Sequence, residues 1–327
     1  MAVPTWASVI IALGAAAIVA LSAEYIVTRL TRKPFRPAGK HCFITGGSTG
    51  LGKALAIELA KRGANVTIVA RRQNELETAA QEIEAHKLTE VQRVVVVSAD
   101  VTSKEDVVRA FDEAKVKMGV DPDFVCTCAG ASFPKYFLDH TMDDFERSIR
   151  LNYLGQTYVA HQAATRMRDG NLKGKIVFVS SMLGLLSFVG YATYSPSKFA
   201  VRGLADTLRN ELKRYGIDVH IFFPGNIDSP GYVTENMTKP DVTKEIEGAS
   251  PALAPSECAK ALIHGLDAGH YMITTEFIGD LLRSAVRGVN PSNNFVLDSL
   301  LSLIAQPVGS IYAMYMDYMV KKLKNDE

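Results

Sequence analysis

The chain has 327 residues, 47% of them hydrophobic, so it can bury one large α/β core without a second one. Its 36 basic and 35 acidic residues leave a net charge of +1, which argues against a nucleic-acid partner. Four scattered cysteines (Cys42, Cys126, Cys128 and Cys258) exclude a disulfide framework and fit a reducing compartment. Because Cys126 and Cys128 have no second Cys or His pair nearby, we expect buried thiols and no metal site.

An uncharged apolar stretch lies near the start of the chain. At ~1.5 Å per residue, residues 6–23 nearly cross a hydrocarbon core of about 30 Å, and the stretch to Thr28 adds interfacial length. The charges that follow are all basic: Arg29, Arg32, Lys33, Arg36 and Lys40. We therefore expect a transmembrane anchor over residues 1–28, a linker over 29–39, and a cytosolic position for the rest. A cleaved signal peptide is the alternative, but its first residues should be basic and these carry no Lys or Arg.

Strand and helix patterns alternate over residues 40–275, which is typical of a doubly wound parallel α/β sheet of the Rossmann type. Apolar, largely β-branched runs predict strands at 41–45, 65–70, 93–99, 124–128, 176–180 and 219–223, with 271–275 as a candidate seventh. Helices are predicted between them at 51–62, 74–86, 104–118, 142–167, 192–215 and 256–268. We therefore expect a single Rossmann-type domain.

Two later stretches do not fit this alternation. Residues 230–251 are long and poorly patterned, and we predict a mobile substrate lid there. Residues 295–320 are apolar, although Asp298, Pro307 and Asp317 interrupt them. They could span a membrane, lie in its interface or pack on the core. We favour membrane association of residues 276–327 over a clean span, and a C-terminal oligomer interface is the alternative.

The first predicted strand runs into a glycine-rich loop, Thr-Gly-Gly-Ser-Thr-Gly-Leu-Gly at 45–52, and then a helix. Glycines permit a tight turn and a close approach to a pyrophosphate, whose charge suits the positive end of the helix. The spacing differs from the general dinucleotide fingerprint, and such a loop can also be only a turn. We predict a nucleotide site there, formed by Gly46, Ser48, Thr49, Gly50 and Gly52.

Charged residues follow the next two predicted strands. Arg71 and Arg72 stand where an NAD site usually carries an acidic residue for the ribose 2′-hydroxyl. Arginines there suit a 2′-phosphate and favour NADPH; the alternative is two exposed cations that open the next helix. Asp100 can accept a hydrogen bond from adenine or cap the following helix.

Tyr194 and Lys198 stand four residues apart in a predicted helix, so both side chains share one face. A free tyrosine has a pKa near ~10. We expect the adjacent ammonium to lower that pKa and make Tyr194 a general acid or base. Ser181, at the end of a predicted strand, would bring a hydroxyl beside it. The alternative is a surface tyrosine and a solvated lysine, since this spacing recurs by chance.

Together with Asn152 in Leu-Asn-Tyr-Leu-Gly and with Pro224-Gly225, these motifs resemble the short-chain dehydrogenase/reductase family over residues 40–275. The resemblance implies a catalytic tetrad of Asn152, Ser181, Tyr194 and Lys198. It implies cofactor contacts from the glycine loop, Arg71, Asp100, Tyr194 and Lys198, with Ile227 in the segment that closes over the nicotinamide. Asn152 would anchor a water that passes protons to Lys198; its alternative is a helix-interior polar group bonded to backbone carbonyl. Thr127-Cys128-Ala129-Gly130 departs from the usual Asn-Asn-Ala-Gly.

Within the family, the sequence most resembles the membrane-anchored reductases of a long-chain sphingoid ketone. The stretches that carry this likeness are 43–53, 69–71, 145–155, 175–181, 194–205 and 228–231. They imply NADPH-dependent ketone reduction in sphingolipid synthesis at the cytosolic face of the endoplasmic reticulum, with the bilayer and a second copy of the chain as candidate partners. The alternatives are an anchored reductase of 3-ketoacyl-CoA, steroid or retinoid substrates, and a non-catalytic NADPH-binding membrane scaffold.

Overall fold

A parallel sheet of seven strands, in the order β3-β2-β1-β4-β5-β6-β7, forms the centre of the computed structural model, which describes residues 5–31, 34–248 and 251–323. The strands are β1 His41–Thr45, β2 Asn65–Ala70, β3 Val94–Ser98, β4 Phe124–Thr127, β5 Lys175–Val179, β6 Asp218–Phe223 and β7 Met272–Thr274. The predicted doubly wound sheet is confirmed, including its seventh strand. The strand order reverses between β1 and β4, and ligands bind at the carboxyl ends of strands at such a point.

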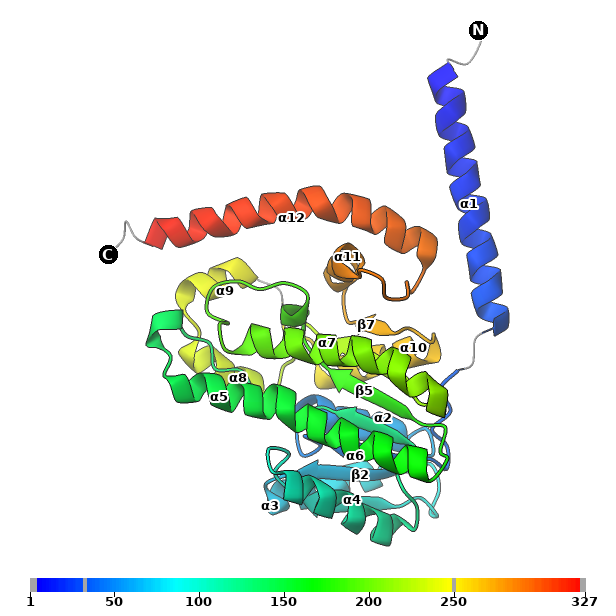
Figure 1. Cartoon of the computed structure of the whole chain (residues 1–327), viewed down its shortest axis with the longest axis vertical. Helices are drawn as coiled ribbons and strands as arrows, with labels where there is room; N and C mark the ends of the chain where they lie inside the picture. Colours follow the sequence, from blue (N-terminus) through cyan, green and yellow to red (C-terminus); the bar gives the residue numbers. More distant parts are fainter. Residues whose placement is uncertain (1–4, 32–33, 249–250, 324–327) are drawn as a thin grey trace.

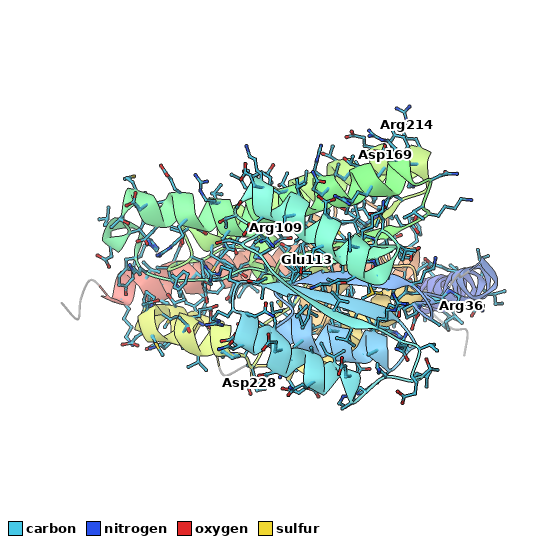
Figure 2. The ribbon with its side chains drawn as sticks, turned by 90° about the horizontal axis from the view of Figure 1, so that it is seen from below. Arg36, Arg109, Glu113, Asp169, Arg214 and Asp228 are labelled. Carbon is cyan, nitrogen blue, oxygen red and sulfur yellow. The ribbon has the colours of Figure 1, made fainter. Side chains whose placement is uncertain are left out.

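Helices cover both faces of the sheet, as Figures 1 and 2 show. One face carries α2 (Gly50–Ala60), α3 (Gln73–Glu84) and α10 (Pro255–Asp267); the other carries α4 (Lys104–Met118), α6 (Gly155–Asp169) and α7 (Tyr194–Glu211). Because both faces are covered, every residue of β1 is buried. Charged side chains such as Arg109 and Glu113 of α4 lie on the outside of the helical layer (Figure 2).

The helix predicted over 142–167 is present, with a change of winding in the middle. It consists of α5 (Met142–Ile149), the π-helical turn η2 (Arg150–Leu154) and α6. Asn152 lies within η2 and is fully buried. Single π-helical turns inside α-helices occur frequently at functional sites.

The poorly patterned stretch predicted as a lid contains two helices, α8 (Pro230–Thr238) and α9 (Asp241–Glu247), while residues 249–250 lie outside the described chain. Ser229 caps α8 by accepting a hydrogen bond from the Tyr232 amide at 3.3 Å, and Pro230 occupies the first turn. We call residues 229–248 the lid. Its helices are missing from the prediction because part of its buried face is charged and therefore shows no apolar period.

Two apolar helices flank the domain, α1 (Thr5–Thr31) and α12 (Phe295–Leu323). By length and composition, Trp6–Glu24 and Phe295–Lys322 are both suited to cross a membrane, with mean hydropathies of 2.2 and 1.4. α1 projects away from the domain, whereas α12 runs along it, over α9 and α11 (Phe277–Val286) (Figure 1). Arg32 and Lys33 of the predicted basic linker lie outside the described residues.

α12 is held to the domain by buried polar contacts. Arg283 of α11 forms two hydrogen bonds with the buried Asp298 carboxylate, at 2.7 and 2.9 Å. Further along α12, the Tyr312 hydroxyl donates to the Ile246 carbonyl of the lid at 3.3 Å. Asp298, which interrupts the apolar pattern of the sequence, is therefore an attachment point of the helix.

Candidate active site

A cleft of about 350 Å³ opens at the carboxyl ends of the strands. Its walls are the loops after the strands, the start of α7 and the lid helix α8. The structure brings together, as lining residues, all but one of the predicted site residues: Gly46, Ser48, Thr49, Gly50, Gly52, Arg71, Arg72, Asp100, Ser181, Tyr194, Lys198 and Ile227. The exception is Asn152, which lies behind the wall formed by Gly130.

The glycine-rich loop has a shape that side chains would not permit. Gly46 has φ +66°, and a Cβ on Gly52 would lie 2.3 Å from the Gly46 carbonyl oxygen. Thr49 precedes the first turn of α2 but makes no side-chain capping hydrogen bond there. The first amides of α2 therefore remain available to an anionic ligand in the cleft.

The charged residues after β2 and β3 differ in their partners. Arg72 pairs with Glu75 at 2.7 Å, whereas Arg71 is exposed and has no ion pair within the described parts of the chain. One oxygen of Asp100 accepts hydrogen bonds from the Thr102 amide and hydroxyl, at 2.9 and 2.8 Å. Ser103 rather than Asp100 caps α4, so the capping alternative for Asp100 is wrong.

Three serine hydroxyls fix the position of Tyr194 and Lys198 relative to the end of β5. Ser180 donates to the Lys198 carbonyl at 3.0 Å, and Ser195 donates to the Leu183 carbonyl at 2.6 Å. The Ser181 oxygen accepts a hydrogen bond from the Leu183 amide at 3.2 Å, which caps the short turn η3 (Met182–Gly184). The start of α7 is thus tied to the loop that carries Ser181.

The electrostatics at Tyr194 differ from the expectation. Burial of the hydroxyl raises the pKa of Tyr194 above its usual value, the charge of Glu235 raises it further, and hydrogen bonding with Ser181 opposes both. The Lys198 Nζ lies over the tyrosine ring, 5.4 Å from the centroid, and donates its hydrogen bond to the Val179 carbonyl at 3.0 Å. Burial lowers the pKa of Lys198 to about 8. The expected lowering of the Tyr194 pKa is therefore wrong for this structure.

Asn152 is committed to the backbone of a neighbouring loop. Its Oδ1 accepts from the Ala131 amide at 3.0 Å, and its Nδ2 donates to the Ala131 carbonyl at 2.9 Å and to Ser148 at 3.2 Å. Ser148 in turn donates to the Thr193 carbonyl, directly before Tyr194, at 2.8 Å. These contacts match the structural alternative, and the water-anchoring role stays a prediction.

The departure from the family's Asn-Asn-Ala-Gly is accommodated by hydrogen bonding. The Thr127 hydroxyl donates to Gln156 Oε1 at 2.6 Å, and Gln156 donates to the carbonyls of Asn152 and Val179, both at 3.0 Å. Gln156, which the sequence analysis missed, therefore joins β4 and β5 to η2. Cys126 is fully buried, and its burial raises the pKa of its thiol.

A group of polar residues on the lid side of the cleft was also missed. Tyr191, Glu235, Lys239 and Glu247 contact one another, and Glu235 lines the cleft. The available signal was the spacing of Glu235 and Lys239, four residues apart on one helix face. Because the stretch shows no apolar period, that spacing would predict only an ion pair exposed to solvent.

Comparison with known proteins agrees with the fold. A family model described as short chain dehydrogenase matches residues 40–240. A short-chain dehydrogenase/reductase structure from Mycobacterium ulcerans superposes with a TM-score of 0.65 at 24% identity, over 73% of this chain and 89% of that one. The chain belongs to the short-chain dehydrogenase family. It is therefore an oxidoreductase of the class that uses a nicotinamide dinucleotide, NAD(P).

Individual relatives within the family share one activity in their names. A 3-ketodihydrosphingosine reductase of Cryptococcus neoformans is 41% identical over 89% of this chain and 88% of its own length. A protein of the same name from Bos taurus is 35% identical over 89% of this chain and 87% of its own. A 3-dehydrosphinganine reductase of Danio rerio is 34% identical over the same shares.

Proposed function

We propose that the chain uses NADPH to reduce the ketone of 3-ketodihydrosphingosine to the alcohol of dihydrosphingosine, at the cytosolic face of the endoplasmic reticulum. The observation that carries this proposal is the cleft in which Tyr194, Ser181 and Lys198 lie together with the glycine-rich loop. Relatives at 34 to 41% identity that carry this activity in their names support the choice of substrate.

Tyr194 and Ser181 are suited to protonate a ketone oxygen. As negative charge grows on that oxygen, Ser181 would donate a hydrogen bond and Tyr194 a proton, so the pair would stabilise the charge and complete the alcohol. The raised pKa keeps Tyr194 protonated at neutral pH. A tyrosine that holds its proton is ready to act as the acid, which is the role that reduction requires.

The residues of the cleft fit a nicotinamide dinucleotide. The loop at 46–52 leaves the amides of α2 open to a pyrophosphate. Asp100 and Ile227 line the same cleft and would contact the adenine and the nicotinamide. Arg71, without an ion pair in the described chain, would bind a 2′-phosphate, which favours NADPH over NADH. When bound, NADPH supplies the hydride for the ketone carbon.

Lys198 and Asn152 would support Tyr194. The Lys198 ammonium, at the floor of the cleft, would hold the nicotinamide ribose and return a proton toward Tyr194. Asn152 would keep the loop at Ala131 and the start of α7 in place through Ser148. Its water-anchoring role remains part of the proposal.

The two apolar helices would place this cleft at a membrane. The α1 residue Glu24, at the end of the apolar stretch, accepts a hydrogen bond from the Val296 amide at 3.1 Å and one from the Phe295 amide. The first turn of α12 therefore lies at the domain-proximal end of the proposed span. Because Asp298 and Tyr312 attach α12 to the domain, we propose that α12 lies in the interface and does not cross the bilayer.

The outer face of α12 supports this arrangement. Its exposed large side chains are Phe295, Leu297, Leu300, Leu303, Ile304, Val308, Ile311, Met314, Tyr315, Tyr318 and Val320. The same helix contacts the lid through Tyr312. Each buried CH₂ of an acyl chain is worth about 0.8 kcal/mol, so the tail of a sphingoid ketone would stay in lipid while its polar end enters the cleft.

Charged substitutions on this face test the membrane arrangement. We expect Leu303→Glu with Ile311→Glu to slow reduction of a long-chain ketone held in vesicles, and to leave reduction of a short-chain, water-soluble ketone unchanged. The matched control is Val116→Glu, whose side chain is also apolar and exposed but belongs to α4, on the opposite side of the domain from α12 (Figure 1). A double variant that reduces the vesicle-held ketone at the wild-type rate would contradict an interfacial α12.

A substrate panel tests the reaction itself. Membranes that contain the chain should oxidise NADPH with 3-ketodihydrosphingosine at a rate well above the rates with a 3-ketoacyl-CoA, a ketosteroid and a retinoid. A higher rate with one of the other three would replace the proposed substrate. NADPH binding without turnover of any of the four would favour a non-catalytic scaffold.

A further inference from the structure

The lid carries a group of charges that the proposed reaction steps do not use. Glu235 Oε1 lies 3.0 Å from Lys239 Nζ and accepts a hydrogen bond from the Tyr191 hydroxyl at 2.7 Å. Glu247 lies 2.7 Å from the same ammonium through Oε2 and also accepts from Tyr191. The Lys239 side chain is 0% exposed and that of Glu235 is 16% exposed. We call these four residues the lid cluster.

The lid cluster has an excess of one negative charge. Glu235 and Glu247 carry two carboxylates against the single ammonium of Lys239. Burial lowers the pKa of Lys239, but its hydrogen bond to Glu247 and the two carboxylate charges raise it above its usual value overall. Burial and both carboxylates raise the pKa of Tyr191, so its hydroxyl stays neutral and donates. The neighbouring ion pair of Lys244 and Asp241 is exposed, and its two charges cancel.

Glu235 directs this excess charge into the catalytic cleft. It lines the same cleft as Tyr194 and Ser181, and its charge acts on the Tyr194 hydroxyl. The ion pair with Lys239 and the hydrogen bond from Tyr191 both use the Oε1 atom of Glu235. Within the described chain, its Oε2 has no hydrogen-bond partner and is free to accept one from a ligand.

The excess negative charge of the lid cluster opposes the reaction. Negative charge develops on the ketone oxygen next to Tyr194, and a second negative charge nearby raises the energy of that state. A cation bound to Glu235 would remove this opposition. A sphingoid ketone brings such a cation, because its amino group is on the carbon next to the ketone.

We propose that Glu235 is a specificity-determining residue that binds the ammonium of a 2-amino ketone, with Tyr191 and Lys239 holding its carboxylate in position. This inference rests on the proposed function and extends it. It explains why an acidic residue lines the same cleft as a group that must give up a proton to a developing oxyanion. Neutral 3-keto substrates would leave the excess negative charge of the lid cluster uncompensated and would react more slowly.

The test compares two ketones that differ only in the amino group. The chain in mixed micelles reduces 3-ketodihydrosphingosine or its analogue without the amino group, and kcat/KM is measured for each. Losing one partner of a buried charged contact lowers binding strongly, so the wild type should prefer the amino ketone by about 30-fold or more. In Glu235→Gln, the preference should fall to within about threefold of one, because activity on the amino ketone falls and the carboxylate no longer opposes reduction of the analogue.

The control is Asp241→Asn, which removes an exposed carboxylate from the same lid and should keep the wild-type preference. A Glu235→Gln variant that retains the preference, or loses activity on both ketones in equal proportion, overturns the inference. If that variant does not fold, the wild type decides alone, since equal kcat/KM on the two ketones also overturns it. A wild type inactive on the amino ketone but active on another substrate instead overturns the proposed function.

Discussion

The two walls of the cleft differ in what they present to a ligand. The wall at the strand ends and α7 offers hydroxyls and one ammonium, from Ser181, Tyr194 and Lys198. The lid wall offers the carboxylate of Glu235, supported by a buried lysine. The first set of groups can protonate any ketone, whereas the second distinguishes ketones by charge. The comparison suggests that the reaction and the choice of substrate reside in separate parts of the chain.

The walls also differ in how they are held. Neutral hydrogen bonds from Ser180 and Ser195 to backbone carbonyls fix the catalytic wall. Ion pairs fix the lid, with Lys239 between Glu235 and Glu247. Substitutions in the first wall should therefore change the reaction rate, and substitutions in the second should change lid stability and selectivity.

The largest effect is expected at Tyr194. Tyr194→Phe removes the proton donor and should lower kcat by about 10³-fold, because positioned acids contribute about 10²–10⁴-fold. NADPH affinity, followed by cofactor fluorescence, should change little. Tyr158→Phe is the matched control, since its ring also lies beside an ammonium, 5.6 Å from Lys104, but outside the cleft. Retention of a tenth of the activity by Tyr194→Phe would assign the proton to another group.

The next effect is on the stability of the lid. Lys239→Met leaves two half-buried carboxylates without their cation, which should reduce the free energy of unfolding by about 3 kcal/mol. Thermal unfolding measures this change. The control Lys244→Met breaks an exposed pair with Asp241 and should change stability by less than about 0.5 kcal/mol. Equal melting temperatures of the two variants would show that the lid cluster does not hold the lid.

A smaller effect is expected at the cofactor end of the catalytic wall. Arg71→Ala should raise the KM for NADPH by about 10-fold and leave that for NADH unchanged, since a lost charged hydrogen bond costs about 1.5–3 kcal/mol. Arg72→Ala should change the ratio of the KM for NADPH to the KM for NADH less than Arg71→Ala does, because Arg72 already pairs with Glu75. If the Arg71→Ala enzyme still preferred NADPH over NADH as strongly as the wild type does, Arg71 would no longer support NADPH as the cofactor.

The smallest effect is a dependence on pH. Burial lowers the pKa of Lys198 to about 8, so its ammonium is present below that pH and is lost above it. If the ammonium holds the ribose, kcat/KM for NADPH should fall about fourfold between pH 7 and pH 8.5. A profile that stays flat to pH 10 would show that the charge on Lys198 is not needed for cofactor capture.

The catalytic wall could be predicted from the sequence because its residues follow local rules. Buried strand runs place Ser181, the loop after β1 places the glycines, and a spacing of four residues puts Tyr194 and Lys198 on one helix face. The strands themselves begin and end within one residue of the predicted positions. What the sequence did not reveal was the direction of the Tyr194 pKa, because desolvation depends on packing that spacing does not encode.

The lid and α12 were less predictable because long-range charged contacts hold them. Tyr191 meets Glu247 across 56 positions of sequence, and Arg283 meets Asp298 across 15. In the sequence, Lys239 and Asp298 look like solvated charges or interruptions of an apolar pattern. Only the folded chain shows that each is buried against its partner.

The most direct test of the central claim follows the transferred hydrogen. Membranes that contain the chain are incubated with 3-ketodihydrosphingosine and NADPH deuterated at the transferable position of its nicotinamide, and the product is analysed by mass spectrometry. The expected product is dihydrosphingosine with one deuterium on C3, formed by the Tyr194→Phe variant at about a thousandth of the wild-type rate. Unlabelled product, or labelling by Tyr194→Phe at the wild-type rate, would contradict the central claim.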